Sequence, residues 1–180
     1  MAAAFPDSPS AQEALAGFLH ANDRKEDALA IWRKLAEKAD LTPTLNVARS
    51  LSARGENAVA LELLAAREKD FGDNPLFLGQ LVAAALHEKQ YERCLPGARR
   101  RVETARSASE LEAAVAQAVT AFKQSEKIEE TIKELQAAPQ RPVQLTCLLA
   151  ELHESLGESE RADEVLKIPA EQGETLAIGQ

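Results

Sequence analysis

Three histidines and two cysteines are the residues of this chain whose side chains are best suited to hold a metal or a reactive group. The histidines, His20, His87 and His153, are far apart in the sequence and lack the HExxH spacing that binds zinc. Neither Cys94 nor Cys147 belongs to a CxxC pair, and both lie within apolar helical patterns. We therefore expect packing or surface histidines, reduced and buried cysteines and no cofactor, with a disulfide or a metal site as the alternative for the cysteines.

Motifs for catalysis on nucleotides, phosphate esters or acyl groups are absent from the sequence. There is no GxxxxGK[ST] phosphate loop, no GxGxxG after an expected strand and no GxSxG nucleophile turn. Neighbouring acids such as Glu129 and Glu130 would point to different sides of a helix, where they solvate a surface. We therefore expect a protein that is not an enzyme, while a catalytic domain elsewhere in a longer parent chain stays open.

A cluster of arginines suggests an acidic partner. Residues 93–106 contain five arginines and one acid, a net charge of +4, whereas residues 141–180 contain eight acids and three bases, a net charge of −5. Guanidinium groups bind carboxylates through paired hydrogen bonds, so we expect Arg99, Arg100 and Arg101 to receive an acidic segment of a partner or the acidic end of another copy. The alternatives are a solvated outer face of a helix and, as a third option, RNA binding.

The composition favours a folded helical protein over a nucleic-acid or membrane protein. Of the 180 residues, 45% are hydrophobic, 28% are charged and only 4% are aromatic, while alanine is abundant, so helices can pack closely. The net charge of −8 disfavours binding to nucleic acid or anionic membranes. No apolar run approaches the roughly 18 residues of a membrane span, and the first ten residues do not resemble a signal peptide. We expect a cytoplasmic location.

Apolar residues recur at helical spacing in pairs of arms that are separated by short breaks. Pro43–Phe71 shows this pattern best, because two amphipathic arms flank a break at Arg54-Gly55-Glu56, where glycine can end a helix. Such a hairpin is too small to bury its apolar stripes alone and requires similar neighbours. The expected repeats are about 8–40, 41–72, 73–106, 107–140 and 141–169, followed by a tail at 170–180.

The breaks and prolines also predict where helices begin and end. In four of the five hairpins we expect helices at Pro9–Ala21, Lys25–Ala39, Pro75–His87, Tyr91–Thr104, Ala108–Gln124, Lys127–Ala138, Pro142–Leu156 and Glu158–Ile168. Pro96 is expected to kink or shorten its helix because proline lacks a backbone donor, and Pro169 is expected to end the last helix. Ser107 or Ser109 is expected to cap the fourth hairpin, since Ser109 and Glu112 have the spacing of a capping box.

One small residue follows each break by five positions. These residues are Ala28, Ala60, Cys94, Thr131 and Ala162, at spacings of 32, 34, 37 and 31. With segments such as EDALAIW (26–32), LSARGENAVALELL (51–64), FGDNP (71–75) and LGESERADEVL (156–166), the pattern resembles the tetratricopeptide repeat (TPR), a helix-turn-helix of about 34 residues. The resemblance implies an all-α fold, an α-solenoid of about five antiparallel hairpins that form a right-handed superhelix. FPDS (5–8) resembles the end of a preceding repeat, so we expect the chain to come from a longer array.

The resemblance further implies a concave face, built from the first helix of each hairpin, that receives an extended peptide or a partner helix. Its register places on this face Asn46, Arg49, Gln80, His87, Gln117, Thr120, Lys123, Glu151 and Glu154. Asn46, Gln80 and Gln117 share one position in three successive hairpins, so we expect a ladder of amides beside a partner chain; solvated polar faces are the alternative. The expected function is a non-enzymatic scaffold or adaptor for a protein segment, with end-to-end self-assembly into an oligomer as the alternative.

Overall fold

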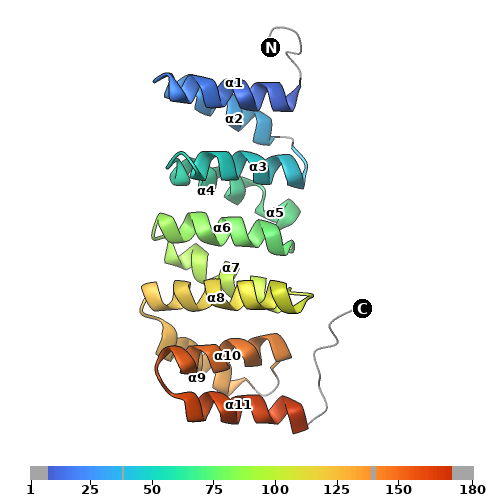
Figure 1. Ribbon diagram of the computed structural model, residues 1–180, viewed down its shortest axis with the longest axis vertical. Coiled ribbons are helices and arrows are strands. Elements are labelled where there is room, and N and C mark those ends of the chain that lie inside the picture. The colour runs from blue at the N-terminus through green and yellow to red at the C-terminus, as the bar shows by residue number, and fades with distance from the viewer. Residues whose placement is uncertain (1–7, 38, 139–140, 172–180) are drawn as a thin grey trace. The chain divides into compact units, whose positions relative to one another are not determined.

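The computed structural model describes residues 8–37, 39–138 and 141–171. Within these ranges helices are the only regular secondary structure (Figure 1), so the expected all-α fold of helical hairpins is confirmed. The chain divides into two compact units, Met1–Gly72 (unit 1) and Asp73–Gln180 (unit 2). The division falls at the end of the second predicted repeat.

Unit 1 contains two hairpins and a short additional helix. Its helices are α1 (Pro9–Ala21), α2 (Lys25–Glu37), α3 (Leu41–Ser52), α4 (Asn57–Ala66) and α5 (Glu68–Phe71). Helix α1 packs on α2, and α3 packs on α4, so each consecutive pair forms one hairpin. Helix α3 also contacts both α1 and α2, which stacks the second hairpin on the first (Figure 1).

Unit 2 contains three further hairpins. Its helices are α6 (Pro75–His87), α7 (Tyr91–Glu103), α8 (Ala108–Gln124), α9 (Ile128–Ala137), α10 (Val143–Ser155) and α11 (Ser159–Glu171). Helix α7 packs on both α6 and α8, and α10 packs on α7, α8, α9 and α11. The last hairpin therefore rests on two preceding hairpins through its first helix.

All five hairpins turn in the same way. A residue in the left-handed backbone conformation follows each first helix: Asp23, Gly55, Lys89, Glu126 and Gly157, with φ between 55° and 80°. The amide of the next residue donates to the carbonyl five positions earlier, as from Arg24 to Leu19 and from Glu158 to His153, both at 3.0 Å. This Schellman ending gives partners to carbonyls that the helix leaves unpaired. The breaks predicted from the sequence are these turns.

The small residues predicted to lie five positions after each turn are buried. Ala28, Ala60, Cys94, Thr131 and Ala162 are each at most 6% exposed. Their small side chains allow the backbones of packed helices to approach closely, which is the physical reason for the repeat in the sequence. Large apolar side chains such as Trp32, Phe77 and Leu149 fill the remaining interior and are fully buried.

The second helix of the second hairpin was predicted to continue to Phe71, and this is wrong. The structure ends α4 at Ala66 and begins α5 at Glu68, because Arg67 leaves helical geometry at φ −105° and ψ 6°. Arg67 Nη1 donates to the carbonyl of Ala36 at 2.9 Å, at the end of α2. The interruption therefore coincides with a contact to the preceding hairpin that periodicity does not reveal.

Two prolines were expected to disturb helices more than they do. Helix α7 runs through Pro96 to Glu103, and α11 runs through Pro169 to Glu171. Pro96 is on the exposed side of α7, where water can bind the carbonyl that loses its donor. An exposed proline inside a helix is therefore tolerated here.

The cap of α8 also differs from the predicted capping box. Ser107 is the capping residue, and its hydroxyl accepts from the amide of Glu110 at 3.2 Å. The Glu110 carboxylate reaches back to accept from the amide of Arg106 at 2.8 Å. Ser107, one of the two predicted caps, is therefore confirmed, whereas the predicted capping box of Ser109 and Glu112 is wrong, because α8 starts at Ala108 and the box begins at Ser107.

Candidate functional site

In unit 1, the predicted partner-binding residues Asn46 and Arg49 lie on α3, and both are exposed. Arg49 Nη2 donates to Asn46 Oδ1 at 2.7 Å, and Arg49 Nε donates to the carbonyl of Leu45 at 3.3 Å. The guanidinium group is therefore held along its own helix. The Arg49 guanidinium group and the Asn46 amide therefore form one polar patch on α3, and Arg49 does not extend away from the helix.

In unit 2, Gln117 on α8 makes hydrogen bonds to two neighbouring helices. Its Nε2 donates to the carbonyl of Gly79 on α6 at 3.0 Å, and its Oε1 accepts from Nη1 of Arg101 on α7. Both ends of the amide are therefore engaged between hairpins. The ladder proposed for Asn46, Gln80 and Gln117 stays a prediction, and a partner would have to compete for the Gln117 amide.

Arg101 reaches from α7 into the contact between α6 and α8. Its Cζ lies 3.1 Å from the place where a Cβ on Gly79 would stand, so the glycine makes room for the guanidinium group. Arg101 Nη1 also donates to the carbonyl of Ala113 at 3.4 Å, while Nε is buried without a hydrogen-bond partner. Burial lowers the pKa of Arg101 because it disfavours the charged form.

No ion pair joins Arg101 to a carboxylate in the part of the chain that the structure describes. The charge of Glu110 favours the protonated guanidinium at longer range and raises the pKa of Arg101, against the larger effect of burial. That carboxylate, however, is hydrogen-bonded to the Arg106 amide. Arg101 is thus a partly buried positive charge whose direct contacts are neutral groups.

The other two predicted arginines make different contacts. Arg99 pairs with Glu103 at 3.2 Å on its own helix and with Glu134 of α9 at 3.8 Å. Arg100 pairs with Asp73, just before α6. The side chains of these pairs are all more than a third exposed, so each pair contributes little to stability. Three consecutive arginines therefore face three different neighbours, and only Arg101 reaches α8.

The remaining predicted residues lie on the first helices of unit 2. Gln80, on α6, is half-buried and follows Gly79, whereas Thr120 and Lys123 are exposed on α8. The Thr120 hydroxyl donates to the carbonyl of Ala116 at 2.9 Å. We define the polar strip of unit 2 as Gln80, Arg101, Gln117, Thr120 and Lys123. The nominated His87, Glu151 and Glu154 are also exposed.

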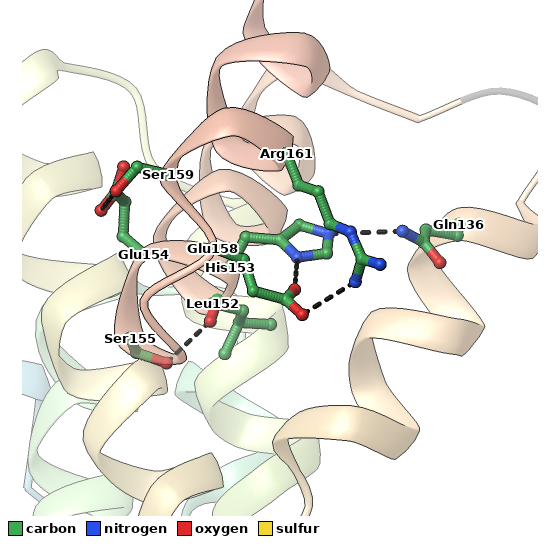
Figure 2. Close-up of polar contacts among 8 residues, drawn as sticks. All are labelled: Gln136, Leu152, His153, Glu154, Ser155, Glu158, Ser159 and Arg161. Carbon is green, nitrogen blue, oxygen red and sulfur yellow. Dashed lines mark hydrogen bonds and ion pairs between the residues drawn. The ribbon is translucent and has the colours of Figure 1, made fainter.

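Two histidines form carboxylate pairs that sequence reasoning missed. His153 is 1% exposed, and its Nδ1–H donates to Glu158 at 2.7 Å, while Gln136 Nε2 donates to its Nε2 at 3.3 Å. Arg161 holds the same carboxylate at 2.8 Å (Figure 2). These contacts lower the pKa of Glu158, with the His153 hydrogen bond as the largest cause.

The second pair is in unit 1. His20 Nε2 donates to Glu56 at 3.1 Å, and Lys25 Nζ contacts the same oxygen at 2.9 Å. Lys25 and then His20 lower the pKa of Glu56. Glu56 and Glu158 both directly follow a left-handed turn residue, and this shared position is the sequence signal that would have found them. Each pair joins a helix end to a turn, which is a structural role.

Metal ligands, membrane-spanning length and the state of the two cysteines are the remaining features of the described ranges. No cluster of three metal-ligating side chains occurs among those residues, and none of their helices combines the length and apolarity of a membrane-spanning segment. Both cysteines are free thiols: Cys94 is buried and Cys147 is half-buried. Burial raises the pKa of Cys94 to about 11, so its thiol is protonated at neutral pH.

Comparisons with solved structures show a likeness in fold. A MamA RS-1 ArsTM double mutant has a TM-score of 0.52 at 18% identity, covering 94% of this chain and 98% of its own. MamA 41-end from Desulfovibrio magneticus RS-1 has a TM-score of 0.51 at 19% identity, with coverage of 92% and 94%. A kinesin light chain from Podosopora anserina with nearly identical TPR-like repeats has a TM-score of 0.49 at 20% identity, with coverage of 94% and 100%.

No protein-family model and no curated protein matches the sequence. At identities of 18% and 19%, likeness to the two MamA structures shows the fold alone. The five hairpins with a common turn and a common buried small residue agree with it. The chain has a TPR-like helical-repeat fold, an architecture whose stacked hairpins offer extended surfaces for binding other proteins.

Proposed function

We propose that this chain is a non-enzymatic scaffold or adaptor that binds an acidic segment of a partner protein along the polar strip of unit 2. Binding along stacked helical hairpins is the general mode of such repeat folds and supports the broad role. The observation that carries the specific proposal is Arg101, whose partly buried charge has no carboxylate partner among the described residues.

An acidic side chain would complete the contacts of Arg101. A guanidinium group has five N–H donors, and the described hydrogen bonds of Arg101 use only Nη1. Those bonds end on neutral oxygens of Ala113 and Gln117, so the positive charge is solvated but not neutralised. A carboxylate from a partner would form a charge-assisted hydrogen bond, which is stronger than a neutral one.

Neighbouring residues on α8 extend the same preference. Thr120 and Lys123 are three positions apart on one helix, so they lie close together on its surface. Lys123 is exposed and adds a second positive charge, while the Thr120 hydroxyl can accept a hydrogen bond from a partner amide. The strip therefore favours a partner segment that carries acidic side chains near Lys123 and a backbone amide that can donate to Thr120.

Fluorescence anisotropy with two labelled peptides of equal length tests this proposal, one rich in glutamate and one rich in glutamine. We expect the glutamate peptide to bind more tightly and with a stronger salt dependence. Lys123→Glu should weaken its binding about five- to tenfold, and Arg101→Met should weaken it more. Lys133→Glu, the same charge change on the exposed side of α9, is the matched control and should have a smaller effect.

The competing outcomes are distinct. Equal binding of the two peptides, or equal effects of Lys123→Glu and Lys133→Glu, would overturn the proposal. Binding of a single-stranded RNA oligonucleotide in place of the glutamate peptide would instead support the RNA alternative. Circular dichroism of Arg101→Met checks that a loss of binding does not reflect a loss of helix.

A further inference from the structure

The surface charge changes sign between α8, which carries one end of the polar strip, and α10, the first helix of the next hairpin. Counted back from the left-handed turn residue, Lys123 of α8 and Glu154 of α10 share the position three residues before the turn. Thr120 and Glu151 share the position six residues before it. All four side chains are exposed. A base and a hydroxyl on one helix therefore correspond to two acids on the next.

These equivalent positions are neighbours in space as well as in the repeat. Helices α8 and α10 pack on each other inside unit 2. Both helices end at the same side of unit 2 (Figure 1), so their last turns lie beside each other. The axes of packed helices are about 8–10 Å apart. The polar strip and the two acids of α10 therefore form one continuous surface that is basic on α8 and acidic on α10.

The opposite charges on this surface do not neutralise each other. Among the residues that the structure describes, no ion pair includes Lys123 or Glu151, although the two stand on packed helices. The Glu154 carboxylate accepts from the Ser159 hydroxyl at 2.9 Å, which is a contact with a neutral group. Both signs of charge can therefore pair with groups of a partner.

We infer that the acidic segment proposed above also carries a basic side chain, about three residues from its acidic ones, that binds Glu151 and Glu154 on α10. This inference rests on the proposed function and names the chemistry of its partner more closely. An extended chain rises about 3.3 Å per residue, so about three residues span the distance between the axes of α8 and α10. The acidic part of the segment then lies at Arg101 and Lys123, and the basic part lies at the two glutamates.

A purely acidic segment fits this surface less well than a segment of mixed charge. Where such a segment continued from α8 to α10, its carboxylates would meet those of Glu151 and Glu154, and like charges at close range repel each other. A lysine or arginine at that place would instead form charge-assisted hydrogen bonds. Opposite charges on the two helices also determine the direction of the bound segment, because the reversed placement brings like charges together.

Two peptides of identical composition test the inference by fluorescence anisotropy. The segregated peptide has glutamates in one half and lysines in the other, and the alternating peptide has the two residues in strict alternation. Their net charges are equal, so the net charge of −8 on the protein acts alike on both. We expect the segregated peptide to bind about fivefold more tightly at low salt, and this difference should shrink as salt is added.

A substitution on α10 should have opposite effects on two peptides. Glu151→Gln should weaken binding of the segregated peptide about two- to fivefold, because it removes an attraction. The same change should strengthen binding of the glutamate-rich peptide, because it removes a repulsion. Glu160→Gln, an equal charge change on the exposed side of α11, is the matched control and should leave the affinity for the segregated peptide unchanged.

Failure of this inference can be told apart from failure of the proposed function. Equal affinities for the segregated and alternating peptides, or no loss of affinity with Glu151→Gln, would rule the inference out. The proposed function still stands in that case if the glutamate-rich peptide binds more tightly than the glutamine-rich one. If the glutamate-rich and segregated peptides bind no more tightly than the glutamine-rich peptide, the proposed function and this inference both fail.

Discussion

The two units repeat one hairpin and one turn, yet similar polar side chains join their helices in different directions. Arg67 and Arg101 each stand twelve positions after a turn residue. In unit 1, Arg67 donates back to the Ala36 carbonyl at the end of α2, whereas in unit 2 Arg101 reaches forward to Gln117 on α8. The position in the repeat determines where on the helix a side chain is attached. The neighbouring groups determine which hydrogen-bond partner it reaches.

The histidine pairs of the two units differ in the same manner. His20 at the end of α1 pairs with Glu56 in the turn of the second hairpin, so this contact joins two hairpins. His153 pairs with Glu158 in the turn of its own hairpin, so that contact closes a single repeat. One pair of residue types thus stabilises stacking in unit 1 and a turn in unit 2. The following predictions separate the two units by experiment.

Removing a large core side chain from either unit should have the largest effect. Trp32 and Leu149 are both fully buried. Trp32→Ala should cost about 3–5 kcal/mol in unit 1, and Leu149→Ala about 2–5 kcal/mol in unit 2, because each leaves a cavity. Circular dichroism during urea unfolding measures both losses.

Fluorescence makes this comparison sharper because Trp32 is the single tryptophan of the chain. It lies in unit 1, with the Arg54 guanidinium 5.2 Å from its ring and the His20 ring at 5.8 Å. Leu149→Ala should therefore shift the circular dichroism transition and leave the fluorescence midpoint unchanged, since the units are separately compact. Equal shifts of both signals would show that the two units unfold as one.

The turn residues provide a second, smaller comparison. Gly55 in unit 1 and Gly157 in unit 2 have φ of 80° and 77°, and no atom lies within 4 Å of a Cβ built on either one. Gly55→Ala and Gly157→Ala should each cost about 1 kcal/mol, purely through the backbone conformation. Glu126→Gly, at φ 58°, should stabilise unit 2 by less than about 1 kcal/mol, because glycine also gains freedom in the unfolded chain.

Urea midpoints test these substitutions, and each unit has its own readout. Gly55→Ala should lower the midpoint of Trp32 fluorescence, whereas Gly157→Ala should lower only the circular dichroism midpoint. A Gly157→Ala variant as stable as the wild type would mean that the turn can change conformation without loss. That result would show that the left-handed conformation at Gly157 does not limit the stability of the last hairpin.

Much of the fold could be predicted from the sequence because it depends on local rules. Helical periodicity, breaks and a small residue five positions after each turn identify all five hairpins, and Ala28 and Thr131 are buried as that rule requires. The left-handed turns at Asp23, Lys89 and Glu126 carry no glycine, yet the spacing of the flanking apolar residues still located them. The periodicity of the apolar residues therefore locates a turn even where the turn residue is not glycine.

The candidate site was less predictable because it depends on contacts between helices that are distant in the sequence. The register nominated Gln117 and Arg101 separately, but it did not show that one hydrogen-bonds the other or that Gly79 makes room for them. The His153–Glu158 pair spans only five residues and was missed for another reason: a buried histidine occupies the position that Leu19, Leu51, Ala85 and Phe122 hold in the earlier hairpins. The direction of a side chain depends on its neighbours in space, and a single sequence does not show which residues those neighbours are.

Lowering the pH should give the smallest difference between the units. The pKa of Glu56 and the pKa of Glu158 both lie below the ordinary value of 4.5. Near that pH the unfolded chain therefore binds more protons than the folded chain, so stability rises with pH. The contribution of each carboxylate is fully present above pH 4.5 and is lost as the pH falls through the folded-state pKa.

Glutamine variants isolate this contribution in each unit. Glu56→Gln should cost unit 1 up to about 1 kcal/mol at neutral pH and flatten its loss of stability in acid, as measured by Trp32 fluorescence in urea. Glu158→Gln should flatten the acid limb only in circular dichroism, and Glu160→Gln, on the exposed side of α11, is its control. If Glu158→Gln and the wild type lose stability in parallel below pH 4.5, the His153–Glu158 contact does not stabilise the last turn. The larger acid response should come from Glu56, because Lys25 and His20 both hold its carboxylate and the contact joins two hairpins.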